Sequence, residues 1–137
     1  MPIPDPTKTI LVVEDDEFFA TSIELALSWL TQTSIVLTSS AEKALEVLHD
    51  HSRSVNAVLT DINLPGMTGY RLIADIRGDE RYCRLPILVI SGDADPQAPI
   101  RARGHGADAF FSKPFSTAEM RLKLEELLDA DRIAGAG

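Results

Sequence analysis

Short apolar runs and longer amphipathic stretches alternate along this chain, five of each. The apolar runs have the length and the β-branched or aromatic content of strands, and they cover residues 10–13, 35–37, 57–59, 87–90 and 109–111. Because they are apolar throughout rather than at alternate positions, they are typical of a parallel sheet covered on both faces. The pattern predicts an α/β fold of the (βα)5 type, with one doubly wound, five-stranded parallel sheet.

The amphipathic stretches predict the helices that cover this sheet. Between the first two strands, apolar residues recur at helical spacing over residues 19–30 and form one stripe. The second and the fifth helix are each expected to begin with a capping box, formed by Ser39 with Glu42 and by Ser116 with Glu119.

The remaining segments are shorter or less regular. The third helix is expected around 70–77, and the fourth has room for about two turns within 93–107, where prolines and glycines are frequent. Residues 1–7 contain three prolines and are expected to form an N-terminal extension, and residues 132–137 a flexible C-terminal tail. The 137 residues have the size of a single domain.

Charge and composition narrow the possible functions. Thirteen Lys and Arg residues against 21 Asp and Glu residues give a net charge of −8, which disfavours nucleic-acid binding and suits a cation-binding pocket. No apolar run approaches the roughly 18 residues that cross a bilayer, and the start of the chain lacks the layout of a signal peptide. The single cysteine excludes an internal disulfide. These features favour a cytoplasmic domain that does not enter a membrane.

Chemically capable side chains collect where the predicted strands end. Ligands of open parallel sheets bind outside these carboxyl ends, near the point where the strand order reverses. Polar residues follow four of the strands: Glu14, Asp15 and Asp16 the first, Asp61 the third, Ser91 the fourth and Lys113 the fifth. If the strand order is 2-1-3-4-5, Asp15 and Asp61 converge, and a cation is needed to hold their like charges together.

This group of side chains has the composition of a magnesium-dependent phosphoryl site. Carboxylate oxygens select Mg²⁺, or Mn²⁺ as a substitute, while Lys113 and Ser91 offer an ammonium and a hydroxyl to phosphate oxygens. Each residue alone also has an ordinary interpretation, because acids after a strand often cap a helix and Asp61 precedes a turn rich in Pro and Gly. If each residue were only a helix cap or a turn residue, there would be no reason for the ends of four strands to place acids, a hydroxyl and an ammonium at the same edge of the sheet.

Four segments carry a resemblance to a known family. They read ILVVEDD at 10–16, LTDINLPGM at 59–67, VISG at 89–92, and GAD at 106–108 leading to KPF at 113–115. In this order and at these separations, the chain resembles a response-regulator receiver domain of two-component signalling. The resemblance implies a flavodoxin-like strand order of 2-1-3-4-5 and a receiver domain over residues 8–131.

The resemblance also implies the roles of the acids. Asp61 accepts a phosphoryl group from the phosphohistidine of a histidine kinase or phosphotransfer protein, or from a small donor such as acetyl phosphate. Asp15, Asp61 and the backbone carbonyl of Asn63 bind Mg²⁺, and Glu14 acts through bound water. Asp16 instead begins the first helix.

Further residues are expected to respond to the phosphoryl group. Lys113 pairs with the acids before phosphorylation and with the phosphate afterwards, and its peptide bond to Pro114 is cis. Ser91 moves toward the phosphoryl group and lets Phe110 turn inward, which changes the face formed by the fourth helix, fifth strand and fifth helix. Asn63 and Asp93 are expected to orient a water for dephosphorylation, which predicts a short-lived phosphorylated form.

The chain is therefore expected to be a phosphoacceptor that assists its own phosphorylation and dephosphorylation, without being a free-standing enzyme. The main alternative is a degenerate receiver that acts as a phosphorylation-independent interaction module. A magnesium-dependent phosphatase would need a second acid where Asn63 stands, and a flavin mononucleotide phosphate would be repelled by the acids after the first strand. The sequence does not identify the kinase, the downstream effector or the oligomeric state.

Overall fold

The strands form a single parallel sheet. The structure, a computed structural model, describes residues 8–30 and 32–136, with side chains as far as residue 129. Within these residues the strands are β1 (Lys8–Val13), β2 (Thr33–Thr38), β3 (Ala57–Thr60), β4 (Ile87–Ser91) and β5 (Ala109–Ser112), in the order β2-β1-β3-β4-β5. All four neighbouring pairs are parallel, which confirms the predicted sheet and strand order.

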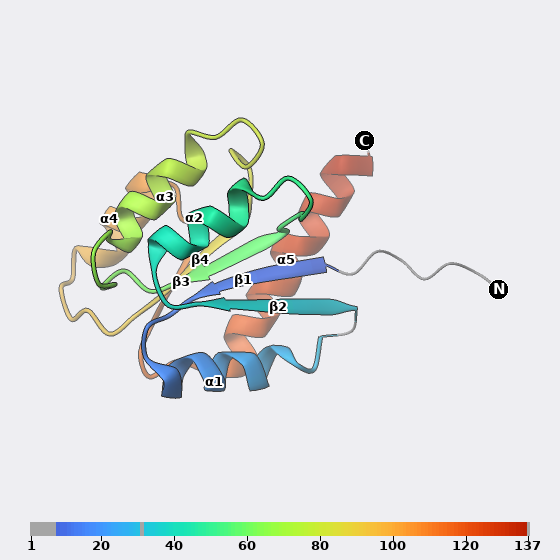
Figure 1. Ribbon diagram of the computed structural model, residues 1–137. Helices are drawn as coiled ribbons and strands as arrows, with labels where there is room; N and C mark the ends of the chain where they lie inside the picture. Colours follow the sequence, from blue (N-terminus) through green and yellow to red (C-terminus); the bar gives the residue numbers. More distant parts are fainter. Residues whose placement is uncertain (1–7, 31, 137) are drawn as a thin grey trace.

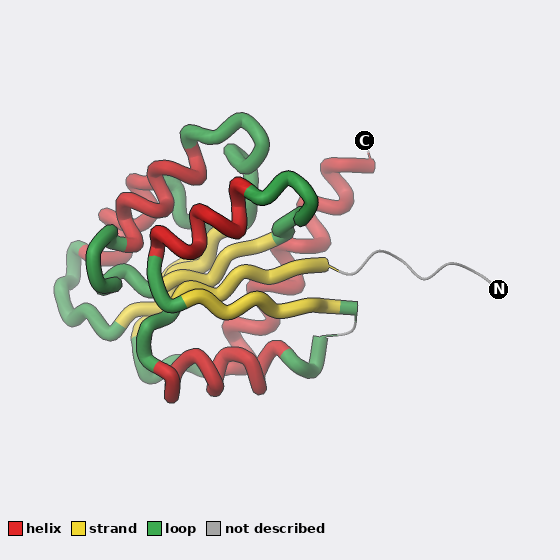
Figure 2. The backbone as a smooth tube through the Cα atoms, in the orientation of Figure 1, coloured by secondary structure: helices red, strands yellow, loops and turns green. Residues whose placement is uncertain are grey.

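Helices cover both faces of this sheet (Figures 1 and 2). They are α1 (Glu17–Leu27), α2 (Ala41–His49), α3 (Gly69–Arg77), α4 (Ala98–His105) and α5 (Thr117–Ala136). Figure 1 shows α1 and α5 on one face and α2, α3 and α4 on the other. The strands run in one direction, so the loops after their carboxyl ends gather at one edge of the sheet.

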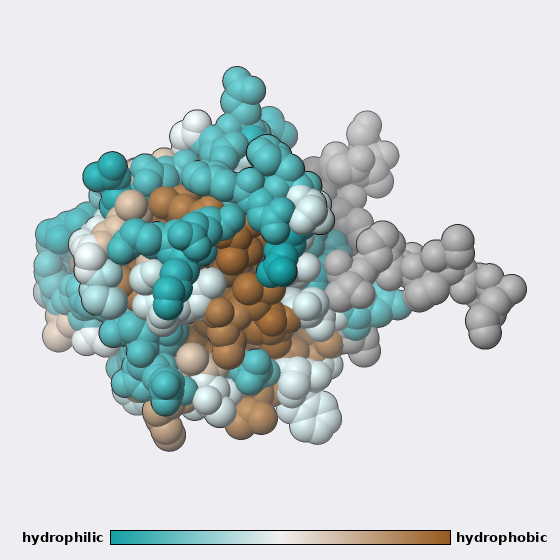
Figure 3. All heavy atoms as spheres, viewed as in Figure 1, coloured by the Kyte–Doolittle hydropathy of each residue, from teal (hydrophilic) through white to brown (hydrophobic). Residues whose placement is uncertain are grey.

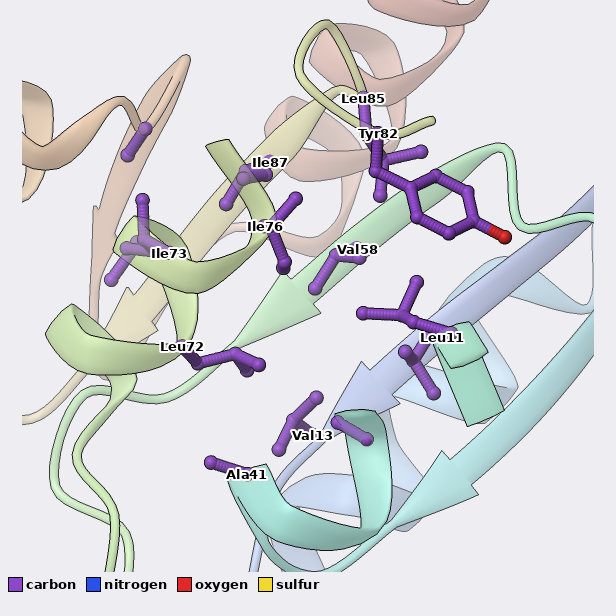
Figure 4. Close-up of a cluster of buried hydrophobic side chains, with 14 of the residues drawn as sticks. Leu11, Val13, Ala41, Val58, Leu72, Ile73, Ile76, Tyr82, Leu85 and Ile87 are labelled. Carbon is purple, nitrogen blue, oxygen red and sulfur yellow. The ribbon is translucent and has the colours of Figure 1, made fainter. Parts of the chain in front are cut away.

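The core has two layers, one on each side of the sheet. Successive residues of β1 point to opposite layers: Leu11 and Val13 pack toward α2 and α3, and Ile10 and Val12 pack toward α1 and α5. All four are fully buried. Figure 4 shows the first layer, in which side chains of α3 lie over β3 and β4. Burial of each large aliphatic side chain stabilises the fold by about 1.5–3 kcal/mol.

Strand register places the functional residues side by side. Val13 pairs with Thr60, and the Asp61 N–H donates to the Val13 carbonyl over 3.0 Å, so the residues after β1 and β3 are neighbours. Ser91 pairs with Ser112 at the ends of β4 and β5. The register alone therefore brings the acids of two strands to one crevice.

One capping prediction is wrong in position. The N-cap of α2 is Ser40, whose hydroxyl accepts the Lys43 N–H, because the helix begins one residue later than the capping box at Ser39 requires. Glu42 is not part of a box and instead accepts the Met67 N–H over 3.2 Å, which ties α2 to the loop after β3.

The other helix starts agree with the sequence. Ser116 accepts the Glu119 N–H over 3.2 Å at the start of α5. Asp16 is the N-cap of α1 and accepts the N–H groups of Phe18 and Phe19. The fourth helix has eight residues, in line with the predicted two turns.

The ends of the chain are described only in part. The predicted extension at 1–7 lies outside the described residues. The backbone of α5 continues to Ala136, so the helix reaches into 132–137, where the flexibility of the tail stays a prediction. None of the helices in the described residues is long and apolar enough to span a membrane.

Candidate functional site

Three carboxylates meet at the carboxyl edge of the sheet, between β1 and β3. Glu14 and Asp15 follow β1 and Asp61 follows β3, and one oxygen from each lies within 4.8 Å of the other two. Glu14 and Asp61 are buried, whereas Asp15 is exposed at the mouth of the crevice. The convergence of Asp15 and Asp61 that the strand order predicts is confirmed.

Lys113 reaches this cluster from the end of β5. Its Nζ donates to Asp61 Oδ2 over 2.8 Å and also to Glu14 Oε1. The side chain is mostly buried, so the ion pairs are shielded from water. One ammonium thus pairs with two of the three acids, as expected before phosphorylation. The peptide bond between Lys113 and Pro114 is cis, as predicted.

The second oxygen of Asp61 is held by the backbone. Asp61 Oδ1 accepts the Ile62 N–H over 2.6 Å and the Asn63 N–H over 3.2 Å. The Gly69 N–H donates to the Ile62 carbonyl over 2.8 Å, which closes the loop after β3. A Cβ on Gly69 would lie only 2.2 Å from the Asp61 carbonyl oxygen, so this close approach requires glycine. Both Asp61 oxygens are therefore fixed in orientation.

Burial governs the protonation of Glu14. Desolvation raises the pKa of Glu14 from its usual 4.5 to about 7; the Lys113 hydrogen bond opposes this shift and the nearby Asp61 adds to it. Burial by itself lowers the pKa of Lys113, but its bonds to Asp61 and Glu14 outweigh that effect and raise it. The lysine therefore stays charged, while the acids together carry an excess of negative charge.

The oxygen atoms of the cluster fit a hard divalent cation. Among the described residues, Glu14 Oε2 is buried without a hydrogen-bond partner, which is costly for a carboxylate oxygen. The cluster consists of carboxylates with neither sulfur nor imidazole, and such ligands prefer Mg²⁺ or Mn²⁺ to zinc or copper. Glu14, Asp15 and Asp61 are thus suited to hold the metal that the sequence predicts.

Of the residues predicted to form the switch, Ser91 lies next to Lys113, whose N–H donates to the Ser91 carbonyl over 2.8 Å. Ser91 is fully buried at the end of β4, and its hydroxyl accepts the Asp93 N–H over 3.1 Å. The Asp93 side chain accepts the Asp95 N–H over 2.9 Å. Phe110 is half-buried and packs against the core layer of α2 and α3. Their parts in switching stay predictions, as does the metal-binding role of the Asn63 carbonyl.

One contact in the site is absent from the sequence-based prediction. The Lys113 Nζ lies 4.1 Å from the centroid of the Phe19 ring, a cation–π distance. Helical spacing identified Phe19 only as part of an apolar stripe. The available signal was an aromatic residue four positions after Asp15, but helical spacing does not reveal a partner from a segment far away in the sequence.

Comparison with known proteins agrees with this geometry. The sequence model of the response regulator receiver domain family matches residues 10–125 of this chain. The chain is 32% identical over 120 residues to the chemotaxis protein CheY of Pseudomonas aeruginosa, covering 88% of this chain and 95% of that protein. It is 31% identical over 121 residues to the cell cycle response regulator CtrA of Brucella ovis, covering 87% of this chain but 49% of that protein. The chain thus spans about half the length of CtrA.

Solved structures show the same architecture. A putative response regulator from Chloroflexus aurantiacus has 30% identity and a TM-score of 0.83, with 91% of this chain and 99% of that chain covered. The receiver domain of a sensor histidine kinase from Pseudomonas aeruginosa has 27% identity and a TM-score of 0.79, covering 89% and 98% of the two chains, with a magnesium ion in its active site cleft. From the family match, the fold and the acidic pocket together, the chain belongs to the response regulator receiver domains of two-component signalling.

Proposed function

We propose that this domain is a phosphorylation-dependent signalling switch in which Asp61 accepts a phosphoryl group from the phosphohistidine of a histidine kinase or phosphotransfer protein. The observation that carries the proposal is the fixed position of Asp61, with Lys113 Nζ 2.8 Å from Oδ2 and two backbone N–H groups on Oδ1. A carboxylate that is held in this way needs little reorganisation to attack phosphorus.

The transfer step is a displacement at phosphorus. An Asp61 oxygen forms a bond to phosphorus as the bond from phosphorus to the donor imidazole nitrogen breaks, which gives an aspartyl phosphate and free histidine. Lys113 moves from the carboxylate to a phosphoryl oxygen and neutralises part of its charge. Acetyl phosphate serves in the same way, with acetate as the leaving group.

The acids around Asp61 supply the metal site of this reaction. Asp15, Asp61 and the Asn63 carbonyl would hold Mg²⁺ directly, or Mn²⁺ in its place, and Glu14 would hold it through water. When bound, the cation would neutralise negative charge on the transferring phosphoryl group. The unpartnered Glu14 Oε2 and the hard oxygen ligands support this assignment.

Phosphorylation then changes a surface. The Ser91 hydroxyl, which accepts the Asp93 N–H in this structure, turns toward the phosphoryl group, and Phe110 moves inward as it does so. The α4–β5–α5 face repacks and presents the signal to a downstream effector. Asn63 and Asp93 orient a water that hydrolyses the aspartyl phosphate, so the phosphorylated state is short-lived.

The proposal places the domain in the cytoplasm, between a histidine kinase or phosphotransfer protein and an effector of unidentified type. The alternative of a degenerate receiver is not favoured, because each predicted site position holds a chemically competent residue and the structure brings three acids and Lys113 together.

Incubation with acetyl phosphate and Mg²⁺, followed by intact mass measurement, tests this function. The wild type should gain one phosphoryl group and Asp61→Asn none. Asp16→Asn is a matched control, because it neutralises an acid at the same edge and asparagine still caps α1. An unmodified wild type would establish the degenerate receiver, and a modified Asp61→Asn would move the acceptor to another residue.

A further inference from the structure

A cavity lies at the amino end of the sheet, opposite the phosphoacceptor crevice. Its walls come from the loop between α2 and β3 and the loop between α3 and β4, and its volume is about 370 Å³. Figure 1 shows these two loops together beyond the ends at which β3 and β4 begin. The volume lies within the roughly 300–1,000 Å³ that is usual for small-molecule sites.

The charged side chains of this cavity are mainly basic. Arg81 and Arg84 line it, against one acid, Glu80. Arg81 is held in place, because its Nη2 donates to the Arg53 carbonyl over 2.7 Å and its guanidinium lies 4.9 Å from the centroid of the Tyr82 ring. Arg84 is exposed, and among the described residues its guanidinium has neither an ion pair nor a hydrogen bond. Although the chain has a net charge of −8, no acid of the described residues pairs with this guanidinium beside the cavity.

Hydrogen bonds from residues outside the cavity hold its walls in place. Arg77 of α3 donates from Nη1 to the Leu85 carbonyl over 2.7 Å and to the Cys83 carbonyl over 3.3 Å, which fixes the loop after α3. On the other side, Asn56 Oδ1 accepts the Thr9 N–H over 2.8 Å. Figure 3 shows a hydrophilic surface over the loop after α3, at the top of the view.

Beneath this hydrophilic rim, Tyr82 supplies an apolar wall with an unsatisfied polar group. Its side chain is 5% exposed, and its hydroxyl has no hydrogen-bond partner among the described residues. Figure 4 shows the ring over β3, with the hydroxyl directed toward the end where that strand begins. The hydroxyl is covered by surrounding atoms, so Tyr82 offers apolar ring atoms rather than a hydrogen bond to a ligand in the cavity.

We propose that this cavity binds a small organic anion, a carboxylate or phosphate ester with an apolar or planar body. Arg84 and Arg81 bind the oxyanion, and Tyr82 with its neighbours contacts the apolar part. The site is separate from the phosphoacceptor crevice and does not depend on the chemistry of Asp61.

Cys83 provides a direct probe of this site. It is the only cysteine of the chain, it is exposed, and it lines the cavity. The rate of its modification is measured with two aromatic disulfides, dithiobis(nitrobenzoate), which is a dianion, and dithiodipyridine, which is neutral. Each rate is measured on the folded wild type, on Arg84→Gln, and on Arg103→Gln, which removes the same charge from exposed α4.

The proposal predicts that Arg84→Gln lowers the ratio of the dianion rate to the neutral rate several-fold, while Arg103→Gln leaves it nearly unchanged. At constant ionic strength, inorganic phosphate or citrate should slow the neutral reagent on the wild type but not on Arg84→Gln. If only phosphate or only citrate slows the modification of Cys83, that result identifies the oxyanion that the cavity prefers. Equal ratios in wild type and Arg84→Gln, an equal effect of Arg103→Gln, or no protection by either anion would overturn the proposal.

Discussion

At the scale of single residues, the site holds unfavourable negative charge that a bound cation would offset. Glu14 is buried beside Asp61, and one lysine offsets only part of their repulsion. Because its pKa is raised by burial, ionised Glu14 destabilises the folded state, and the fold is more stable when this carboxyl is protonated. The ionised acids of the site therefore lower the stability of the metal-free fold.

This imbalance predicts a pH-dependent effect of Glu14→Gln in metal-free buffer. The folded pKa of about 7 lies above the usual 4.5, so the wild type loses stability as pH rises between these values, and the variant does not. Urea unfolding should show the variant more stable at pH 8 by up to about 3 kcal/mol, with the difference shrinking toward pH 5. Glu17→Gln, at an exposed position, serves as the control. A difference that is the same at both pH values would contradict the assignment.

The ring of Phe19 gives a second prediction at this scale. Phe19→Leu keeps an apolar side chain but removes the cation–π contact with Lys113, so it should slow phosphorylation by acetyl phosphate several-fold and destabilise the fold by about 1 kcal/mol. Trp29 is 77% exposed and lies outside this contact, and Trp29→Leu should change neither quantity. Equal transfer rates for the two variants would show that the ring does not position the lysine.

At the scale of elements, the loop from β3 to α3 controls the orientation of Asp61. Gly69 lies against the backbone of Asp61 and Ile62, whereas Gly104 in α4 has no atom within 4 Å of where its Cβ would lie. Gly69→Ala should therefore destabilise the fold by about 1–3 kcal/mol and slow phosphorylation, because the loop must move. Gly104→Ala should stabilise it by up to about 1 kcal/mol through helix propensity. Thermal unfolding measures the stability of both variants, and the rate of phosphorylation by acetyl phosphate measures their reactivity. An unchanged phosphorylation rate in Gly69→Ala would refute the role of this loop.

The elements were largely predictable because their signals are local. Continuous apolar runs identified all five strands, and the structure extends each of them by one or two residues at one or both ends. The start of α2 was misplaced, because Ser39 and Ser40 are both good caps and the choice depends on backbone angles. The cation–π contact of Phe19 and the close approach of Gly69 depend on residues far apart in sequence, so spacing could not reveal them. The candidate acids and Lys113 were predictable because the strand order fixes which strand ends meet.

At the scale of the whole molecule, the proposed metal site predicts a link between Mg²⁺ binding and folding. A ligand that binds only the folded state adds stability, about 2.7 kcal/mol at one hundred times its dissociation constant. Mg²⁺ should therefore raise the melting temperature of the wild type, and a chelator should reverse the effect. Asp15→Asn should weaken this response, because it removes the exposed carboxylate of the cluster. A melting temperature independent of Mg²⁺ would contradict the metal assignment.

The most direct measurement identifies the residue that carries the phosphoryl group. Protein treated with acetyl phosphate and Mg²⁺ is reduced with borohydride, which converts aspartyl phosphate to homoserine, and its peptides are sequenced by mass spectrometry. The account predicts homoserine at position 61 alone, and none when a chelator removes the metal. Homoserine in place of Asp15 or Asp16, or formation independent of Mg²⁺, would contradict it.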